Sequence, residues 1–203
     1  LRVDYDAPRR YKQLRDLLGA DRLTDIDRFL LDDATYSNRL QNDLRHPDRT
    51  VGEGDRFGYD YRTVRCEVAA DGVVRYRSDR WTAAFGASVG RCVVRRRGFY
   101  EKELFPGAGS YGGSSRLRFT PYALRASAGY AFSSRSYLEI SASASAAVPD
   151  VEDMFLQPLY NNRTVDDPSL SRRYGAELGF VRTGGAFELR VTGYLAATRD
   201  EIR

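Results

Sequence analysis

Few side chains in this sequence have the types and spacing that catalysis or metal binding requires. There are two cysteines, Cys66 and Cys92, and one histidine, His46. These residues are too few to form a Cys/His zinc site, and a single His in the stretch RHPD does not establish a catalytic triad. We therefore expect His46 to be a solvated loop residue, and we expect a protein that is not an enzyme and needs no cofactor.

Acidic residues form two groups that deserve a test against known sites. The first group lacks the D-x-D-x-D-G spacing of a calcium loop, so a solvated face explains it better; it comprises Asp21, Asp25, Asp27, Asp32 and Asp33. The second group could serve a hydrolase at the rim of a barrel, but no histidine accompanies it; it comprises Asp150, Glu152, Asp153, Asp166 and Asp167. The stretch VGEGDRFG is not a phosphate loop, because no strand precedes it and no Gly-Lys-Ser/Thr follows.

The charge balance and the hydropathy exclude two classes of protein. The chain has 32 basic and 28 acidic residues, a net charge of +4, and the basic residues are scattered among the acids. A nucleic-acid-binding face would cluster them, so we expect no nucleic-acid partner. No run approaches the ~20 apolar residues of a membrane-spanning helix, which excludes a helical membrane protein.

The stretch YLEISASASAAVPD, Tyr137–Asp150, alternates with a period of two residues, as a strand with two different faces does. Even positions from Leu138 to Ala146 are apolar and mostly small, whereas odd positions from Glu139 to Ser145 are polar. A soluble core needs bulky side chains on its inner face. Lipid tails accept Ala as readily as Leu, so the even face is suited to lipid and the odd face to a wet lumen.

The same period predicts six strands of about ten residues or more. This length suits the ~9–11 residues that a tilted strand needs to cross a bilayer. The predicted strands are Arg62–Tyr76, Trp81–Val94, Pro121–Phe132, Tyr137–Ala147, Tyr174–Arg182 and Ala186–Ala197.

The connections alternate between short and long. Arg77–Arg80, Ser133–Arg135 and the pair Gly184-Gly185 are short, and a Gly-Gly pair suits a two-residue hairpin turn. Arg95–Thr120 and Val148–Arg173 are long. Short turns at one rim and long loops at the other are typical of an outer-membrane barrel.

The turns also predict a register. A turn at Ser78-Asp79 pairs Tyr76 with Trp81, and the Gly-Gly turn pairs Arg182 with Phe187. In this register each hairpin has one apolar face and one polar face, and a slip of one residue would invert both.

The register places the cysteines apart and the aromatic residues near strand ends. Cys66 falls on the lipid face and Cys92 on the lumen face, so a disulfide between them is excluded. Ten aromatic residues occupy positions where the aromatic girdles of a barrel lie; they are Tyr59, Tyr61, Tyr76, Trp81, Tyr122, Tyr130, Phe132, Tyr137, Tyr174 and Phe187.

The sequence thus predicts an all-β fold, a partial transmembrane antiparallel β-barrel of about six long up-and-down strands. Residues 58–203 would form three hairpins of a larger barrel wall. Residues 1–57 would form an extracellular loop segment with short helices, because Tyr11–Thr35 has helical apolar spacing, with Gly19 as a break and Thr24 or Asp25 as a cap.

Two segments resemble TonB-dependent outer-membrane receptors. The first segment is Val148–Phe180. The family often has a Pro followed by acids and a hydrophobic pair, then a Pro-x-Leu, and then an aromatic residue before Glu-x-Gly. The matching residues here are Pro149, Glu152, Asp153, Met154, Phe155, Pro168, Leu170, Tyr174, Glu177 and Gly179. Asp167 stands where the family usually has Asn. Asp43–Arg62 resembles the loop-to-strand passage of the receptors common in Bacteroidetes, SusC-like or with a carboxypeptidase-regulatory-like extension.

The resemblance implies a fragment of a transporter in the Gram-negative outer membrane, whose ~22-stranded barrel holds a plug. It implies import of a nutrient such as a siderophore or a glycan, with outer-membrane lipid, the plug domain, TonB and a surface lipoprotein as partners. Alternatives are a barrel of another class, porin or rim-loop hydrolase, and a soluble ligand-binding β-sandwich. Candidate ligand or plug contacts are the lumen-facing Glu139, Glu177, Glu188, Arg190 and Tyr194 and the loop residues Tyr160, Asn161, Asn162 and Arg163.

Overall fold

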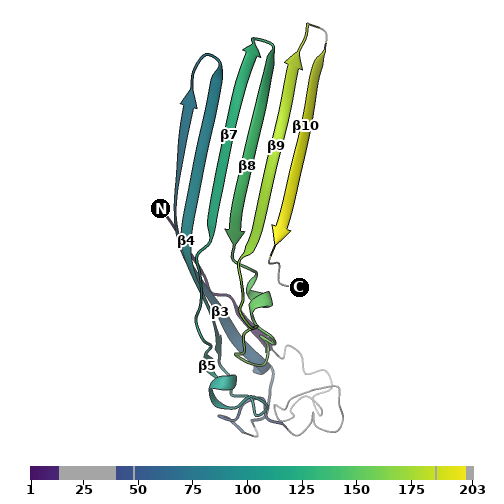
Figure 1. Cartoon of the computed structure of the whole chain (residues 1–203). Helices are drawn as coiled ribbons and strands as arrows, with labels where there is room; N and C mark the ends of the chain where they lie inside the picture. Colours follow the sequence, from purple (N-terminus) through teal and green to yellow (C-terminus); the bar gives the residue numbers. More distant parts are fainter. Residues whose placement is uncertain (14–39, 48, 186, 200–203) are drawn as a thin grey trace.

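Alternating side chains build an all-β fold, seen in a computed structural model that describes residues 1–13, 40–47, 49–185 and 187–199 (Figure 1). Helical structure in these residues is limited to two 3-10 turns, η2 (Gly107–Gly109) and η3 (Val151–Met154). The strands are β1 Arg2–Asp6, β2 Arg9–Gln13, β3 Arg56–Arg77, β4 Trp81–Gly98, β5 Gly112–Gly113, β6 Leu117–Phe119, β7 Tyr122–Ser133, β8 Ser136–Ala147, β9 Ser171–Thr183 and β10 Glu188–Arg199.

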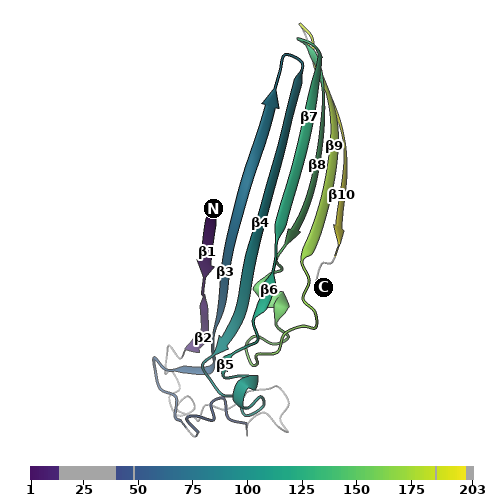
Figure 2. The same ribbon diagram turned by 60° about the vertical axis from the view of Figure 1, so that its left-hand side comes forward.

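The ten strands form one antiparallel sheet. The order across it is β1-β3-β4-β7-β8-β9-β10, with β2 paired to β3, and β5 and β6 paired to β4. The sheet is open, since β1 and β10 end the order of the described strands. Its short hairpin turns lie at one end and its long connections gather at the other (Figures 1 and 2).

The six predicted strands are confirmed, with different boundaries. β3 and β4 extend further toward the loops than the alternation indicated, because their loop ends pair with the short strands β2, β5 and β6. Strands β1 and β2 were not predicted, and they lie in the segment expected to be a loop with helices. The helical spacing predicted for Tyr11–Thr35 is wrong at its start, because Tyr11, Lys12 and Gln13 belong to strand β2, where they pair with β3. The rest of that segment lies outside the described residues.

The predicted register of two hairpins is wrong by two residues. Tyr76 pairs with Ala83 rather than with Trp81, and Arg182 pairs with Leu189 rather than with Phe187. In the first hairpin the Ser78 N–H donates to the Trp81 carbonyl oxygen at 2.8 Å, so the turn lies one residue later than predicted. A shift of two residues keeps every side chain on its predicted face.

The described hydrophobic core is small and lies at the loop end of the sheet. Cys92 and Val94 of β4 pack with Phe119 of β6 and with Met154 and Phe155 of the 148–170 connection. This connection therefore folds back over one face of the sheet. No helix in the described part of the chain is long and apolar enough to span a membrane.

Cysteine cross-linking should distinguish the two registers. In a Cys66→Ala, Cys92→Ala background, the pair Tyr76→Cys and Ala83→Cys should oxidise to a disulfide, since directly opposed Cα atoms lie ~4.5–5.5 Å apart. The pair Tyr76→Cys and Trp81→Cys is diagonal and should oxidise more slowly. Mass spectrometry of the linked peptides measures both yields, and a higher yield for the Trp81 pair would contradict the observed register.

Candidate functional site

One face of the sheet, here called the apolar face, is uncharged over the middle of the long strands. Charged side chains join it only toward the ends, where Arg91 lies opposite Val68, Arg172 opposite Ala146 and Arg182 opposite Leu189. β1 continues it, because Val3 pairs with Val68 and Tyr5 pairs with Cys66. The apolar face consists of Val68, Ala70, Gly72, Val74 and Tyr76 of β3, Trp81, Ala83, Phe85, Ala87 and Val89 of β4, Tyr122, Leu124, Ala126, Ala128 and Tyr130 of β7, Leu138, Ile140, Ala142, Ala144 and Ala146 of β8, Tyr174, Ala176, Leu178 and Phe180 of β9, and Leu189, Val191, Gly193, Leu195 and Ala197 of β10.

Aromatic side chains bound the apolar face at both ends. Near the hairpin turns, the ring centroids of Trp81 and Tyr130 lie 4.7 Å apart, and those of Tyr130 and Phe132 lie 5.1 Å apart. Tyr122 and Tyr174 lie on the same face toward the loops. Of the other predicted girdle residues, Tyr137 lies on the opposite face, where it pairs with Val181, and Tyr61 is buried among the loops.

The opposite face, here called the polar face, carries the predicted lumen residues. Glu177 pairs with Ser141 and with Tyr194, Glu139 pairs with Gly179, and Arg190 pairs with Val181. Glu188 shares this face with Arg190, and all five predicted side chains are exposed. Glu139 and Glu177 line a hollow of about 200 Å³ together with Ser127 and Ser141.

The predicted loop residues have different environments. Asn161 and Asn162 are buried, whereas Arg163 is exposed and Tyr160 is half-buried. The Asn161 carboxamide oxygen accepts the Arg163 N–H at 2.9 Å. The Asn162 Nδ2 donates to the carbonyl oxygens of Ala108 and Tyr111, at 2.9 and 3.3 Å. Asn161 and Asn162 therefore hold the loop conformation.

Arg96 joins the two long connections. Its side chain is buried, with only 2% of the residue exposed, and its Nε donates to the Pro158 carbonyl oxygen at 2.6 Å. One terminal nitrogen donates to Asn162 Oδ1 at 2.5 Å and to the Ser110 carbonyl oxygen at 3.2 Å. Arg96 was not among the predicted site residues, although the alternation through Cys92 and Val94 places it on the polar face.

The charge of Arg96 has no counter-ion among the described residues. Burial lowers the pKa of Arg96 to about 10, while the nearby Tyr61 raises it slightly. Because the unfolded chain binds more protons above this pKa, the contribution of Arg96 to stability rises with pH from about 10 upward. At neutral pH, burying this cation costs roughly 3 kcal/mol, which its hydrogen bonds to three oxygens must offset.

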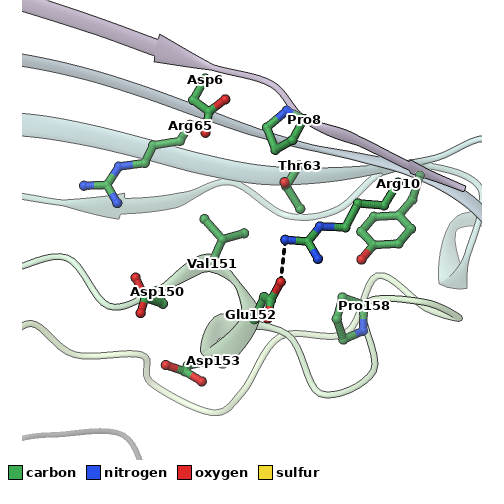
Figure 3. A pocket seen from close by; sticks show the side chains of 11 residues that line it. Asp6, Pro8, Arg10, Thr63, Arg65, Asp150, Val151, Glu152, Asp153 and Pro158 are labelled. Carbon is green, nitrogen blue, oxygen red and sulfur yellow. Dashed lines mark ion pairs between the residues drawn. The ribbon is translucent and has the colours of Figure 1, made fainter.

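A cavity of about 340 Å³ lies between the strands and η3 (Figure 3). Arg10 of β2 forms an ion pair with Glu152 of η3 at 2.5 Å, which links the two walls of the cavity. Buried Tyr61 and Thr63 line it from β3. The Arg96 guanidinium carbon lies 4.9 Å from the centroid of the Tyr61 ring, so the loop contacts also support this wall.

Asp150 and Asp153, two of the predicted rim acids, also line the cavity, together with Glu152. Asp166 and Asp167 lie outside it and are exposed. Asp167 has a φ of 48°, a left-handed conformation that Asn and Asp adopt more readily than most residues.

The remaining candidate residues lie on separate segments of the described part of the chain. Cys66 and Cys92 are both free thiols, as expected, and Cys92 is buried. His46 is mostly exposed, and its Nδ1 lies 2.7 Å from the buried Asp43 carboxylate. The described residues contain no cluster of acids, His and Cys that could hold a metal. The group from Asp21 to Asp33 lies outside the described residues.

Comparisons of this chain with protein-family models, with curated proteins and with solved structures find no match.

Replacing Asn162 should loosen the loop end of the sheet. Asn162→Ala removes an acceptor from a buried guanidinium, so we expect it to lower the free energy of unfolding by ~2 kcal/mol. It should also speed hydrogen exchange in residues 148–170. The matched control is Arg163→Ala, because Arg163 is exposed and its N–H contact is unaffected. Equal effects of the two variants would contradict the role of Asn162.

Proposed function

We propose that this chain forms part of the wall of a TonB-dependent receptor in the Gram-negative outer membrane. In this proposal the apolar face meets lipid, and the polar face meets a hydrated lumen and the plug. The receptor imports a nutrient, such as a siderophore or a glycan, and makes or breaks no covalent bond. The observation that carries the proposal is the apolar face, which is uncharged over the middle of five neighbouring strands, β3, β4, β7, β8 and β9, and of β10 beside them.

The exposure of this face supports lipid as its solvent. The described residues leave large side chains uncovered there, among them Phe85 (52% exposed), Ile140 (54%) and Val191 (57%). An apolar surface of this extent is uncommon in water, where it marks an interaction site. A soluble sandwich would cover it with a second sheet ~10 Å away, but the described strands form one layer.

The dimensions of the face also support a membrane. Tyr122 and Tyr130 bound it on β7 and are eight residues apart, which corresponds to ~26 Å along the strand. The apolar band of outer-membrane barrels is ~25 Å tall, and aromatic girdles flank it. Strand tilt would reduce the height that this face spans to ~20 Å.

The loop end supports assignment as the extracellular rim. Outer-membrane barrels have short periplasmic turns and longer extracellular loops, and here all long connections lie at one end (Figure 2). The connection 148–170 packs onto the polar face through Met154 and Phe155. A receptor uses such inward-folded loops to contact a nutrient before the plug moves.

The assignment to TonB-dependent receptors, rather than to another barrel class, depends on the resemblance of Val148–Phe180 and Asp43–Arg62 to that family. Under this proposal the partners are lipid, the plug domain, TonB and a surface lipoprotein. The exposed polar-face residues Glu139, Glu177 and Tyr194 are then available to the plug or to a passing nutrient.

Arginine substitutions one residue apart should separate the two faces. Ala142 pairs with Ala126 and Ala176 midway between the aromatic rows, so Ala142→Arg should cost ~2–4 kcal/mol in lipid vesicles. Ser141→Arg should cost much less, because Ser141 lies on the polar face opposite Glu177. Reversible unfolding from vesicles, followed by the fluorescence of Trp81, the only tryptophan, measures both variants.

Two outcomes of this comparison would contradict the proposal. Equal costs at Ala142 and Ser141 would mean that the two faces meet similar surroundings. A larger cost at Ser141 would mean that the polar face is a packed interior, as in a soluble protein.

The gene that encodes this chain should supply the remaining parts of a receptor. We expect the flanking coding sequence to contain a plug domain and a TonB box upstream and further strands downstream. Sequencing the complete gene is the measurement. An open reading frame with neither a plug domain nor additional strands would contradict the receptor assignment.

A further inference from the structure

Two hydroxyl groups of buried residues line the cavity beside η3 and have no hydrogen-bond partner among the described residues. Tyr61 is 3% exposed and Thr63 is 7% exposed, and both line the cavity. Figure 3 shows the Thr63 side chain extending from its strand toward η3. The phenol and hydroxyl oxygens of these residues have no hydrogen bond with any described residue. The two hydroxyl groups open into the cavity and are not fully enclosed, since the fully buried side-chain atoms without a partner among the described residues are Arg62 Nε and Ser171 Oγ. Both hydroxyls are therefore accessible to a ligand in the cavity.

The charges around the cavity are unbalanced. Two guanidinium groups line it and both have acidic partners, since Arg10 pairs with Glu152 and Arg65 pairs with Glu67 at 2.8 Å. Three further carboxylates line it without an ion-pair partner among the described residues; they are Asp6, Asp150 and Asp153. These three residues are exposed at the rim of the cavity. Every polar lining side chain that lacks a partner among the described residues can therefore accept a hydrogen bond, and none of them is a cation.

We propose that this cavity binds an organic cation, an ammonium or guanidinium group carried by a small molecule or by a peptide side chain. Such groups carry several N–H donors and a positive charge, which the free carboxylates and the two hydroxyl oxygens complement. The carboxylates do not cluster closely enough to hold a metal ion, so the ligand has to spread its donors across the cavity. This inference rests on the proposed receptor function for its biological role.

The size and surroundings of the cavity suit such a ligand. Its volume of about 340 Å³ lies at the lower end of the range for small-molecule sites, ~300–1,000 Å³. Pro8, Pro158 and Val151 provide apolar surface for the carbon part of the ligand. The ion pair of Arg10 with Glu152 holds β2 to η3 and keeps the cavity formed.

The probe for this site is 1,5-diaminopentane, and 1,5-pentanediol is its uncharged match in length. Titration calorimetry of the folded chain in detergent at low salt should show saturable one-to-one binding of the diamine and at least tenfold weaker binding of the diol. Thr63→Val and Tyr61→Phe preserve shape and remove one hydroxyl each, so each should raise the Kd of the diamine about fivefold. Asp6→Asn should also raise it.

The control variant is Asp71→Asn, which removes an exposed carboxylate from the polar face outside this cavity. It should change the Kd of the diamine by less than twofold. An effect equal to that of Asp6→Asn would mean that the diamine is attracted by the overall negative charge of the surface rather than bound in the cavity, and it would overturn the proposal. Equal affinities for diamine and diol, or no saturable diamine binding by the folded protein, would also overturn it. The unfolding costs of Ala142→Arg and Ser141→Arg do not depend on this ligand, so failure of the cavity and failure of the receptor proposal are distinguishable.

Discussion

The structure depends on a register that keeps the charged side chains of the long strands off the middle of one face. Within this register each side chain lies beside neighbours of its own kind. Ala142, for example, lies between Ala126 and Ala176, and Ser141 lies between Ser127 and Glu177. A slip of one residue in any hairpin would place charged groups such as Glu139 among the apolar side chains. The two-residue period of the strand therefore fixes the sheet more strictly than any single contact.

The loop end depends on a different kind of interaction. There the described core is only a few side chains, Cys92, Val94, Phe119, Met154 and Phe155, and the Arg96 guanidinium donates to oxygens of both long connections. A buried cation is costly, yet its donors satisfy acceptors from connections that are far apart in sequence. A hydrophobic residue at this position would leave those oxygens unpaired, which explains why a charged side chain can be retained inside a loop cluster.

The sequence predicted the sheet well because its determinants are local. Alternation in Tyr137–Ala147 or Trp81–Val94 is visible in a short window, and it identified the long strands and both faces. The turn position was wrong by one residue at Ser78, since hydrogen bonds across a hairpin are not visible in composition. The role of Arg96 and the cavity were not predicted for another reason. Both depend on contacts between residues that are far apart in the sequence, such as Arg10 with Glu152 and Arg96 with Asn162.

The two ends of the sheet place opposite demands on the same strands. Between the aromatic rows a strand needs only the correct alternation, so small residues such as Ala142 and Ala144 suffice wherever the surrounding solvent is apolar. Beyond Val89, the side chains of β4 make specific contacts with the long connections. Arg96 donates a hydrogen bond to Asn162 in the loop and lies over the ring of Tyr61 in the cavity wall. Because β3 and β4 run through both regions as continuous strands, Arg96 of the loop cluster pairs directly with the cavity residue Thr63, and the apolar face begins only further along the same strand at Val68.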